Sequence, residues 1–224
     1  MNYTDKTVPL CPTFTALVHL IAKDLLPEGW DVIPDAPNTL PDLIAYYREH
    51  NRIAINVESR HGATVGDLEA HYAFRAWHDY LHVLDYERHK DEDFTLAGER
   101  RVADMHRQEL VRRLGYTPEA NWMGALVQIE IVAANEFKLR FGDWAPDSRA
   151  FALRWLKDRG FDRPASLGGT VFAPAKPSIF APARHAGFGF DVLGNTEPAD
   201  WAPTPPILNR GALDAALALE SVGG

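Results

Sequence analysis

Residues 122–140 constrain the fold of this chain most strongly, because their apolar side chains cannot share one narrow face of a helix. A helix that is apolar on more than one face is normally buried inside a domain. Thr117 precedes the stretch as a candidate N-cap, and Pro118 suits the first helical position. We therefore predict a central buried helix in an α-helical domain. Its apolar residues are Leu126, Val127, Ile129, Ile131, Val132, Ala133 and Phe137.

Five further segments show helical periodicity together with capping or terminating residues. Residues 53–57 alternate as in a short strand, whereas residues 31–38 contain Pro and Asp and are expected to form a loop. The sequence thus predicts an all-α fold, a compact bundle of about six helices within residues 1–164. The five segments are residues 14–26, residues 40–50, a histidine-bearing segment that begins near residue 67, residues 96–115 and residues 147–156.

Beyond Pro164 the composition changes to Gly-Gly and repeated Ala-Pro and Lys-Pro steps, which disfavour regular structure. This part nevertheless contains more aromatic residues than a solvated linker would. We predict that residues 165–224 form an irregular Pro/Gly-rich arm laid over the helical body, with a short helix at residues 211–219. The aromatic residues are Phe172, Phe180, Phe188, Phe190 and Trp201.

The composition argues against several classes of function. The chain of 224 residues carries a formal net charge of −8 and no long block of Lys or Arg, so nucleic-acid binding is not expected. Its single cysteine, Cys11, excludes an intrachain disulfide and a thiolate-rich zinc site. Its apolar runs are far shorter than the roughly 20 residues of a transmembrane helix, and residues 1–10 lack the pattern of a secretion signal. We expect a soluble, cytoplasmic protein with no transmembrane segment.

Four histidines lie within about 40° of one another when residues 68–89 are wound as a helix. They lie opposite an apolar face, which is also the arrangement of an ordinary surface helix. A solvent-facing side normally favours Lys and Glu, however, so imidazoles in these positions favour a specific use. The stripe consists of His71, His78, His82 and His89.

His78 and His82 are four residues apart with Asp79 beside them, which is the spacing with which one helix can bind one metal ion. Two imidazoles are at most half of a stable site, so further ligands must come from another segment. Glu99, in the first turn of the next predicted helix, is the first candidate. The other candidates are His106, seven residues after Glu99, and Glu130, within the apolar helix.

Two histidines with carboxylates suit Zn²⁺, and Fe²⁺ or Mn²⁺ are alternatives as the number of carboxylates rises. With one coordination position open, such an ion acidifies a bound water toward about pH 7 or polarises a substrate oxygen. Arg75, one turn before His78, is a candidate for holding an anionic group of a small-molecule substrate. Tyr86, one turn after His82, is a candidate proton donor. The sequence leaves the substrate and the reaction open.

The motif HDYLH at residues 78–82, followed by LAGE at residues 96–99, resembles the HDxxH-x11-E zinc signature of the ubiquinone-biosynthesis protein family. The resemblance implies a helical fold and a metal site formed by His78, Asp79, His82 and Glu99. Sixteen residues separate His82 from Glu99 here, where the family has eleven, so an insertion at residues 87–93 is expected to loop out. Residues 74–79 also resemble a segment of uncharacterised phage-encoded proteins.

Three other functions fit parts of the pattern. The HD-phosphohydrolase superfamily of metal-dependent nucleotide phosphohydrolases would use His61, His78, Asp79 and Asp143, although the gap from His61 to His78 is short for that fold. A dimetal oxygenase would need more carboxylates on facing helices than the sequence offers. A structural or assembly protein would bind a stabilising metal ion or none.

Overall fold

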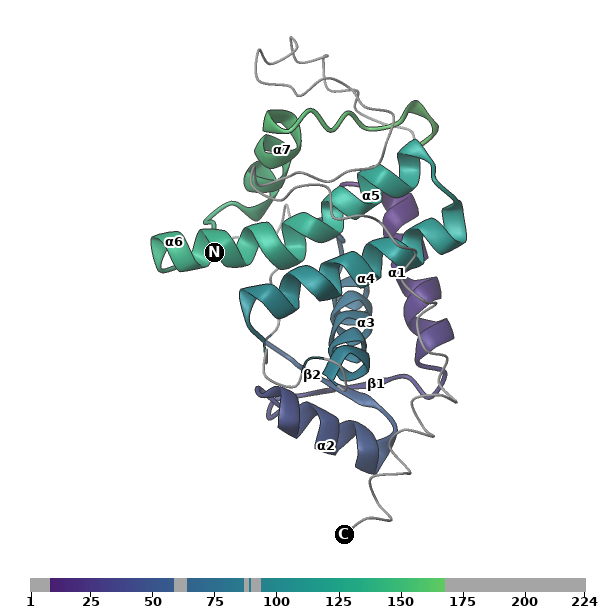
Figure 1. Ribbon diagram of the computed structural model, residues 1–224, viewed down its shortest axis with the longest axis vertical. Coiled ribbons are helices and arrows are strands. Elements are labelled where there is room, and N and C mark those ends of the chain that lie inside the picture. Colours follow the sequence, from purple (N-terminus) through teal and green to yellow (C-terminus); the bar gives the residue numbers. More distant parts are fainter. Residues whose placement is uncertain (1–8, 59–63, 87–88, 90–93, 168–224) are drawn as a thin grey trace. The chain divides into compact units, whose positions relative to one another are not determined.

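The computed structural model describes residues 9–58, 64–86, 89 and 94–167, which belong to one compact unit (Figure 1). Helices dominate this part and confirm the predicted all-α class. None of its helices combines the length and the apolar character that crossing a bilayer requires. Apart from residues 165–167, the predicted C-terminal arm lies outside the described residues. The helices are α1 (Pro12–Leu25), α2 (Leu40–His50), α3 (Leu68–Tyr86), α4 (Leu96–Leu114), α5 (Pro118–Gln128), the π-helical η2 (Ile129–Ala133), α6 (Ala134–Phe141), α7 (Ser148–Asp158) and the short η3 (Ala165–Leu167).

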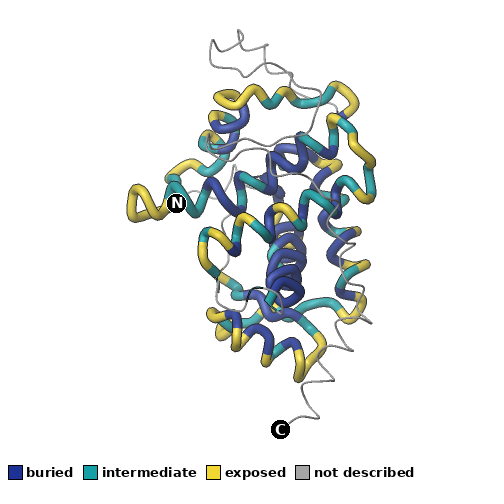
Figure 2. The backbone as a smooth tube through the Cα atoms, in the orientation of Figure 1, coloured by how far each residue is buried: buried dark blue, intermediate teal, exposed yellow. Residues whose placement is uncertain are grey.

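The histidine-bearing helix α3 lies at the centre of the core. Every residue from Ala70 to Asp85 is buried except Arg75, and Figure 2 shows this helix as a nearly continuous dark blue coil. α3 contacts α1, α2, α4 and β2, so neighbours surround it on several sides. Its histidine face is therefore enclosed as well as its apolar face.

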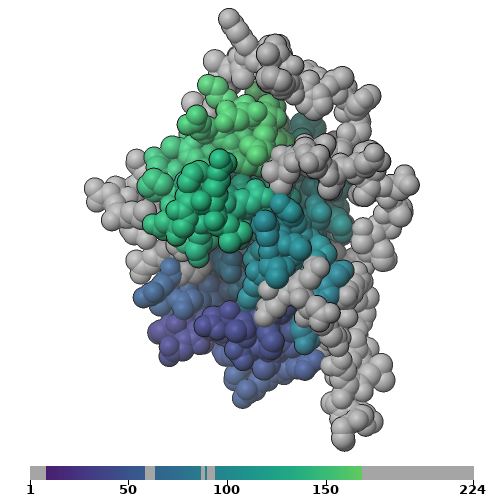
Figure 3. Space-filling model, turned by 60° about the vertical axis from the view of Figure 1, so that its left-hand side comes forward, coloured from purple at the N-terminus to yellow at the C-terminus, as the bar shows by residue number. Residues whose placement is uncertain are grey.

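The elements α5, η2 and α6 follow one another without a break and form the predicted helix over residues 122–140. Thr117 caps it as predicted, since its hydroxyl accepts a hydrogen bond from the backbone N–H of Ala120 at 3.2 Å. The predicted burial is correct as far as η2 and wrong beyond it, because α6 contains no buried residue. Leu139 and Phe141 are 73% and 60% exposed. The reason is that α6 projects from the helical body (Figure 1) and contributes to the green surface in Figure 3.

Two short strands accompany the helices in the described part of the chain. β1 (Trp30–Ile33) and β2 (Ile53–Asn56) pair in parallel with their first residues opposite each other, and α2 connects them. β2 confirms the predicted strand, whereas the loop predicted at residues 31–38 is wrong over residues 31–33. β1 depends on a partner far along the chain and on Asp31, whose Oδ1 accepts a hydrogen bond from Arg52 Nε at 2.9 Å. β2 packs against α3 and helps to fix it in the core.

Candidate metal centre

Two imidazoles leave the same face of α3. His78 and His82 are one helical turn apart, so their rings are neighbours along the helix. Their side chains are only 1% and 2% exposed, and their Nε2 atoms lie 3.2 Å apart. At these two positions the histidine stripe is part of the protein interior.

Glu99 reaches the two imidazoles from the first turn of α4. Thr95 caps this helix, because its hydroxyl accepts a hydrogen bond from the backbone N–H of Gly98 at 3.2 Å. The Oε2 atom of Glu99 lies 3.2 Å from Nε2 of His78 and 3.6 Å from Nε2 of His82. The structure therefore brings together three residues named from the sequence, despite the long connection between α3 and α4.

The three ligand atoms form a nearly equilateral triangle with sides of 3.2, 3.2 and 3.6 Å. Bond lengths of about 2.0–2.1 Å and tetrahedral angles separate two ligand atoms of a zinc ion by about 3.3 Å. The triangle thus has the size of one face of a tetrahedral site. His78, His82 and Glu99 form a group that can hold one metal ion.

The Oε2 atom of Glu99 gives an independent test of this fit. It is buried and has no hydrogen-bond partner in the part of the chain that the structure describes. Both imidazoles are within ion-pair distance, but neither directs an N–H group at this oxygen with hydrogen-bonding geometry. A buried carboxylate oxygen in this condition is costly, and a cation at the triangle would satisfy it.

The protonation states of the group also suit a metal ion. Burial lowers the pKa of His78 and outweighs the opposing effect of Glu99, so this imidazole is neutral near pH 7. Burial alone would raise the pKa of Glu99, but the adjacent His78 and His82 hold it well below its usual value. A neutral imidazole and an ionised carboxylate are the forms that bind a metal ion.

A shell of rings surrounds the triangle. His106 of α4 is completely buried, and its Nε2 lies 3.4 Å from Nδ1 of His78. Phe74 stacks on His78 with an interplanar angle of 7°, and Phe94 meets the ring of His82 edge to face at 4.9 Å. The sequence indicated His106 through its spacing from Glu99, but as a ligand and not as a neighbour of His78. Nothing in the sequence pattern singled out Phe94.

Asp79 lies outside the triangle. Its carboxylate is one residue beyond His78, which turns it about 100° around the helix. Its Oδ1 accepts a hydrogen bond from Arg75 Nη2 at 3.0 Å. The structure therefore pairs the predicted ligand with the predicted anion-binding arginine, whose side chain is 36% exposed.

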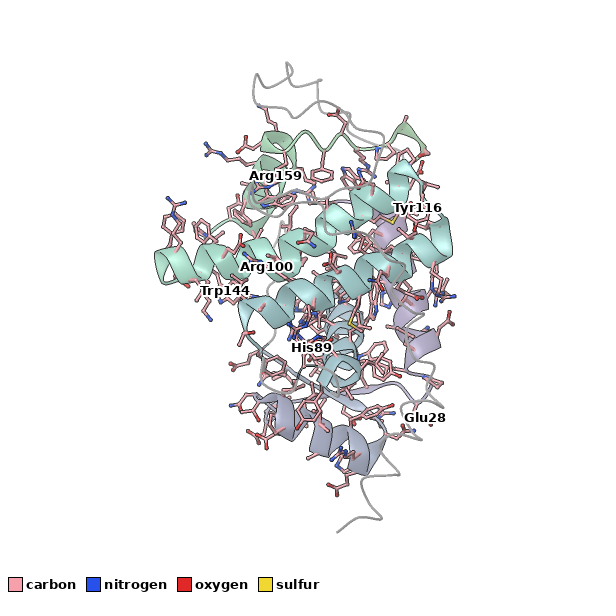
Figure 4. All side chains as sticks on the ribbon, in the orientation of Figure 1. Glu28, His89, Arg100, Tyr116, Trp144 and Arg159 are labelled. Atoms are coloured by element: carbon pink, nitrogen blue, oxygen red, sulfur yellow. The ribbon has the colours of Figure 1, made fainter. Side chains whose placement is uncertain are left out.

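The other predicted site residues lie in different surroundings. Tyr86 is the last residue of α3 and is half-buried, and its role as a proton donor stays a prediction. Glu130, in η2, accepts a hydrogen bond from the backbone N–H of Thr64 at 2.8 Å and thereby fixes the segment before α3. His71 is buried on α3 but is not a member of the candidate metal-binding group. His89, labelled in Figure 4, follows α3 and places its Nδ1 2.8 Å from Asp85 Oδ1.

Comparison of the chain with models of protein families, with curated proteins and with solved structures finds no match. A function for this chain therefore has to be inferred from the geometry of His78, His82 and Glu99.

Proposed function

We propose that this protein is a metal-dependent enzyme that holds one divalent ion, preferably Zn²⁺, at His78, His82 and Glu99. The observation that carries the proposal is the buried triangle of two Nε2 atoms and one Oε2 atom with sides of 3.2–3.6 Å. Two imidazoles and one carboxylate are a donor set that catalytic zinc sites use, and this composition supports the preference for zinc.

The number of ligands supports a catalytic site over a structural one. Structural zinc sites use four protein ligands, most of them cysteines, whereas catalytic sites use three and keep one position open. Among the described residues, no fourth histidine, cysteine or acidic residue joins the group. An ion held there supplies Lewis acidity, by which it activates a bound water or polarises a substrate oxygen.

The protein residues around the triangle have complementary roles in this proposal. Glu99 contributes the negative charge, and its side chain is 12% exposed, so the group is not sealed on its side. The rings of Phe74 and Phe94 limit access of water to the imidazoles. Arg75 is partly exposed and can exchange Asp79 for an anionic group of a substrate.

The resemblance to the zinc signature of the ubiquinone-biosynthesis family supports the same three ligands. We propose a common metal site and leave Asp79 out of it, because this carboxylate is paired with Arg75. Quinone chemistry is not part of the proposal.

A second candidate is an iron-dependent oxygenase. Two histidines and one carboxylate with open positions are the donor set of mononuclear non-haem Fe²⁺ oxygenases. The phosphohydrolase alternative has less support, because Asp143 is exposed and accepts a hydrogen bond from the backbone of Trp144. Its other extra residue, His61, lies outside the described residues.

Metal content tests the proposal directly. Protein purified without chelators is expected to contain about one transition-metal ion per chain, and the double variant His78→Ala/His82→Ala is expected to contain none. His50→Ala is the matched control, because His50 is a partly exposed histidine on α2, outside the group. Stoichiometric metal in the double variant, or its absence from the wild-type protein, would refute the assignment.

Cobalt substitution tests whether the site is catalytic. The absorption spectrum of the Co²⁺-loaded protein is expected to change when a small anion such as azide occupies an open position. An unchanged spectrum would indicate that the ion has no open position and would favour a structural metal site. Dioxygen uptake by the Fe²⁺-loaded protein, without hydrolysis of ester, amide or phosphoester probes by the zinc form, would favour the oxygenase.

A further inference from the structure

His106 is an unusual residue to find in the core of this protein. It is 0% exposed, and its Nδ1 has no hydrogen-bond partner among the described residues. Its ring lies 4.0 Å from that of Trp77 and is nearly parallel to those of Phe74 and His78, at 20° and 15°. Packing therefore fixes the orientation of the imidazole and directs Nε2 toward His78.

The contact between His106 and His78 constrains which ring nitrogen of His78 carries the proton. A neutral imidazole has one N–H group, and the nitrogen that binds a metal ion must be the other one. Because Nε2 of His78 faces the triangle, a ligating His78 must carry its proton on Nδ1. Nε2 of His106, 3.4 Å away, is in position to accept a hydrogen bond from that N–H group.

The contact between the two α3 histidines extends the same arrangement. Nε2 of His82 lies 3.2 Å from Nε2 of His78, and one of these atoms must donate in that contact. If His82 donates in the metal-free protein, His78 accepts at Nε2 and donates from Nδ1 to His106, and His82 gives up this proton when its own Nε2 binds the metal ion. In the reverse direction, the proton on Nε2 of His78 would leave Nδ1 with none to donate to His106.

We propose that His106 is a positioning residue that accepts this hydrogen bond and holds His78 in the tautomer with a free Nε2 atom. The inference rests on the proposed metal site and assigns to α4 a second role beside that of Glu99. Acceptors behind histidine ligands fix the ring and typically change metal affinity by 10–100-fold when they are removed.

The unpaired Nδ1 atom of His106 distinguishes a positioning role of this residue from a role in stabilising the fold. In the proposed tautomer Nδ1 of His106 carries a buried proton without a partner, which destabilises the fold. His106→Leu removes this unsatisfied group and keeps an apolar side chain in the pocket. We therefore expect metal-free His106→Leu to be at least as stable as the metal-free wild-type protein, although it binds zinc more weakly.

The experiment compares the full-length wild-type protein with His106→Leu and His106→Gln. Glutamine can return an acceptor near the position of Nε2. Zinc affinity, measured by competition with a chromophoric chelator, is expected to fall about 10–100-fold in the leucine variant and to recover in the glutamine variant. Urea denaturation in the presence of chelator measures the stability of each metal-free protein.

Nitrogen NMR of ¹⁵N-histidine-labelled protein reads the tautomer of His78 directly, with and without zinc. We expect a proton on Nδ1 of His78 in both wild-type forms and its loss from Nδ1 in metal-free His106→Leu. Unchanged zinc affinity in the leucine variant, or an affinity loss matched by an equal loss of metal-free stability, would overturn the inference. If the wild-type protein binds no metal, the proposed function fails. A proton on Nε2 of His78 in the metal-free protein would refute the role of His106, whether or not the protein binds metal.

Discussion

Glu99→Gln tests the proposed metal site with almost no change in volume, because it removes one charge from the triangle. At a free Zn²⁺ concentration of about 100 times Kd, binding stabilises the wild-type protein by about 2.7 kcal/mol. For a domain of this size, 1 kcal/mol shifts Tm by about 2–4 °C. Zinc is therefore expected to raise the wild-type Tm by about 5–11 °C.

The variant is expected to lose this response, which is measured separately from any change in the stability of the metal-free protein. A hundredfold weaker affinity at the same zinc concentration leaves about 0.4 kcal/mol of stabilisation, or a shift of about 1–2 °C. The metal-free variant gives up no hydrogen bond at Oε2, because that oxygen has no such partner in the described part of the chain. The imidazoles of His78 and His82 nevertheless stabilise the ionised carboxylate and lower its pKa, so the Tm of the metal-free variant is expected to fall modestly at pH 7.

Thermal melts in chelator and in buffered zinc measure the Tm of the metal-free protein and the rise in Tm that zinc causes. Glu136→Gln is the matched control, because this carboxylate on α6 pairs with Arg100 at 2.8 Å and lies outside the metal-binding group. It should keep the full zinc response. A Glu99→Gln protein that keeps this response would show that the carboxylate is no ligand. A large loss of Tm in its metal-free form, combined with an unchanged zinc response, would show instead that Glu99 only stabilises the fold.

Three further changes test other parts of the structure. Glu109→Gln should lower the free energy of unfolding by about 2–4 kcal/mol at pH 7, since this buried carboxylate accepts hydrogen bonds from two arginines. Burial alone would raise the pKa of Glu109, but these arginines hold it below its usual value. The difference from wild type in urea denaturation should therefore be constant above about pH 5 and narrow as the pH falls through the lowered pKa. Leu81→Ala should cost about 2–5 kcal/mol in the same assay, whereas Leu20→Ala at an exposed site should stay within about 0.5 kcal/mol. Asp79→Asn should keep one metal ion per chain by elemental analysis, and its loss would restore Asp79 to the ligands.

The helices could be predicted from the sequence because their signals are local. Thr117 and Pro118 act within one turn of the helix that they begin, and Gly115 ends α4 with a positive φ of 71°. The strand β1 could not be predicted in this way. Its pairing with β2 depends on a segment beyond α2, and the four residues from Trp30 show no clear alternation of burial.

The candidate metal-binding group could be predicted in part in the same way. The spacing of His78 and His82 places them on one face of any helix, and the helix predicted from residue 96 places Glu99 in its first turn. The burial of that face could not be predicted from the sequence. Whether a polar stripe faces solvent depends on which helix packs over it, and residues 87–93 between α3 and α4 give no such information in their sequence. The sequence also could not show whether Asp79 pairs with Arg75 or binds a metal ion, because a carboxylate serves both in an i,i+4 ion pair and as a metal ligand.

The energetic cost of the buried polar cluster supports a functional role for it. His78, His82 and His106 lie within a core whose other members are largely apolar, and Glu99 lies at its edge with its Oε2 atom buried. A buried polar group with unsatisfied hydrogen bonding costs about 1–3 kcal/mol, and both Oε2 of Glu99 and Nδ1 of His106 are in this condition among the described residues. Apolar side chains of similar volume at these positions would remove the cost. A buried cluster with two unsatisfied polar atoms is most simply explained by a bound cation, which would contact Oε2 of Glu99 and require the tautomer that leaves the unpaired proton on His106.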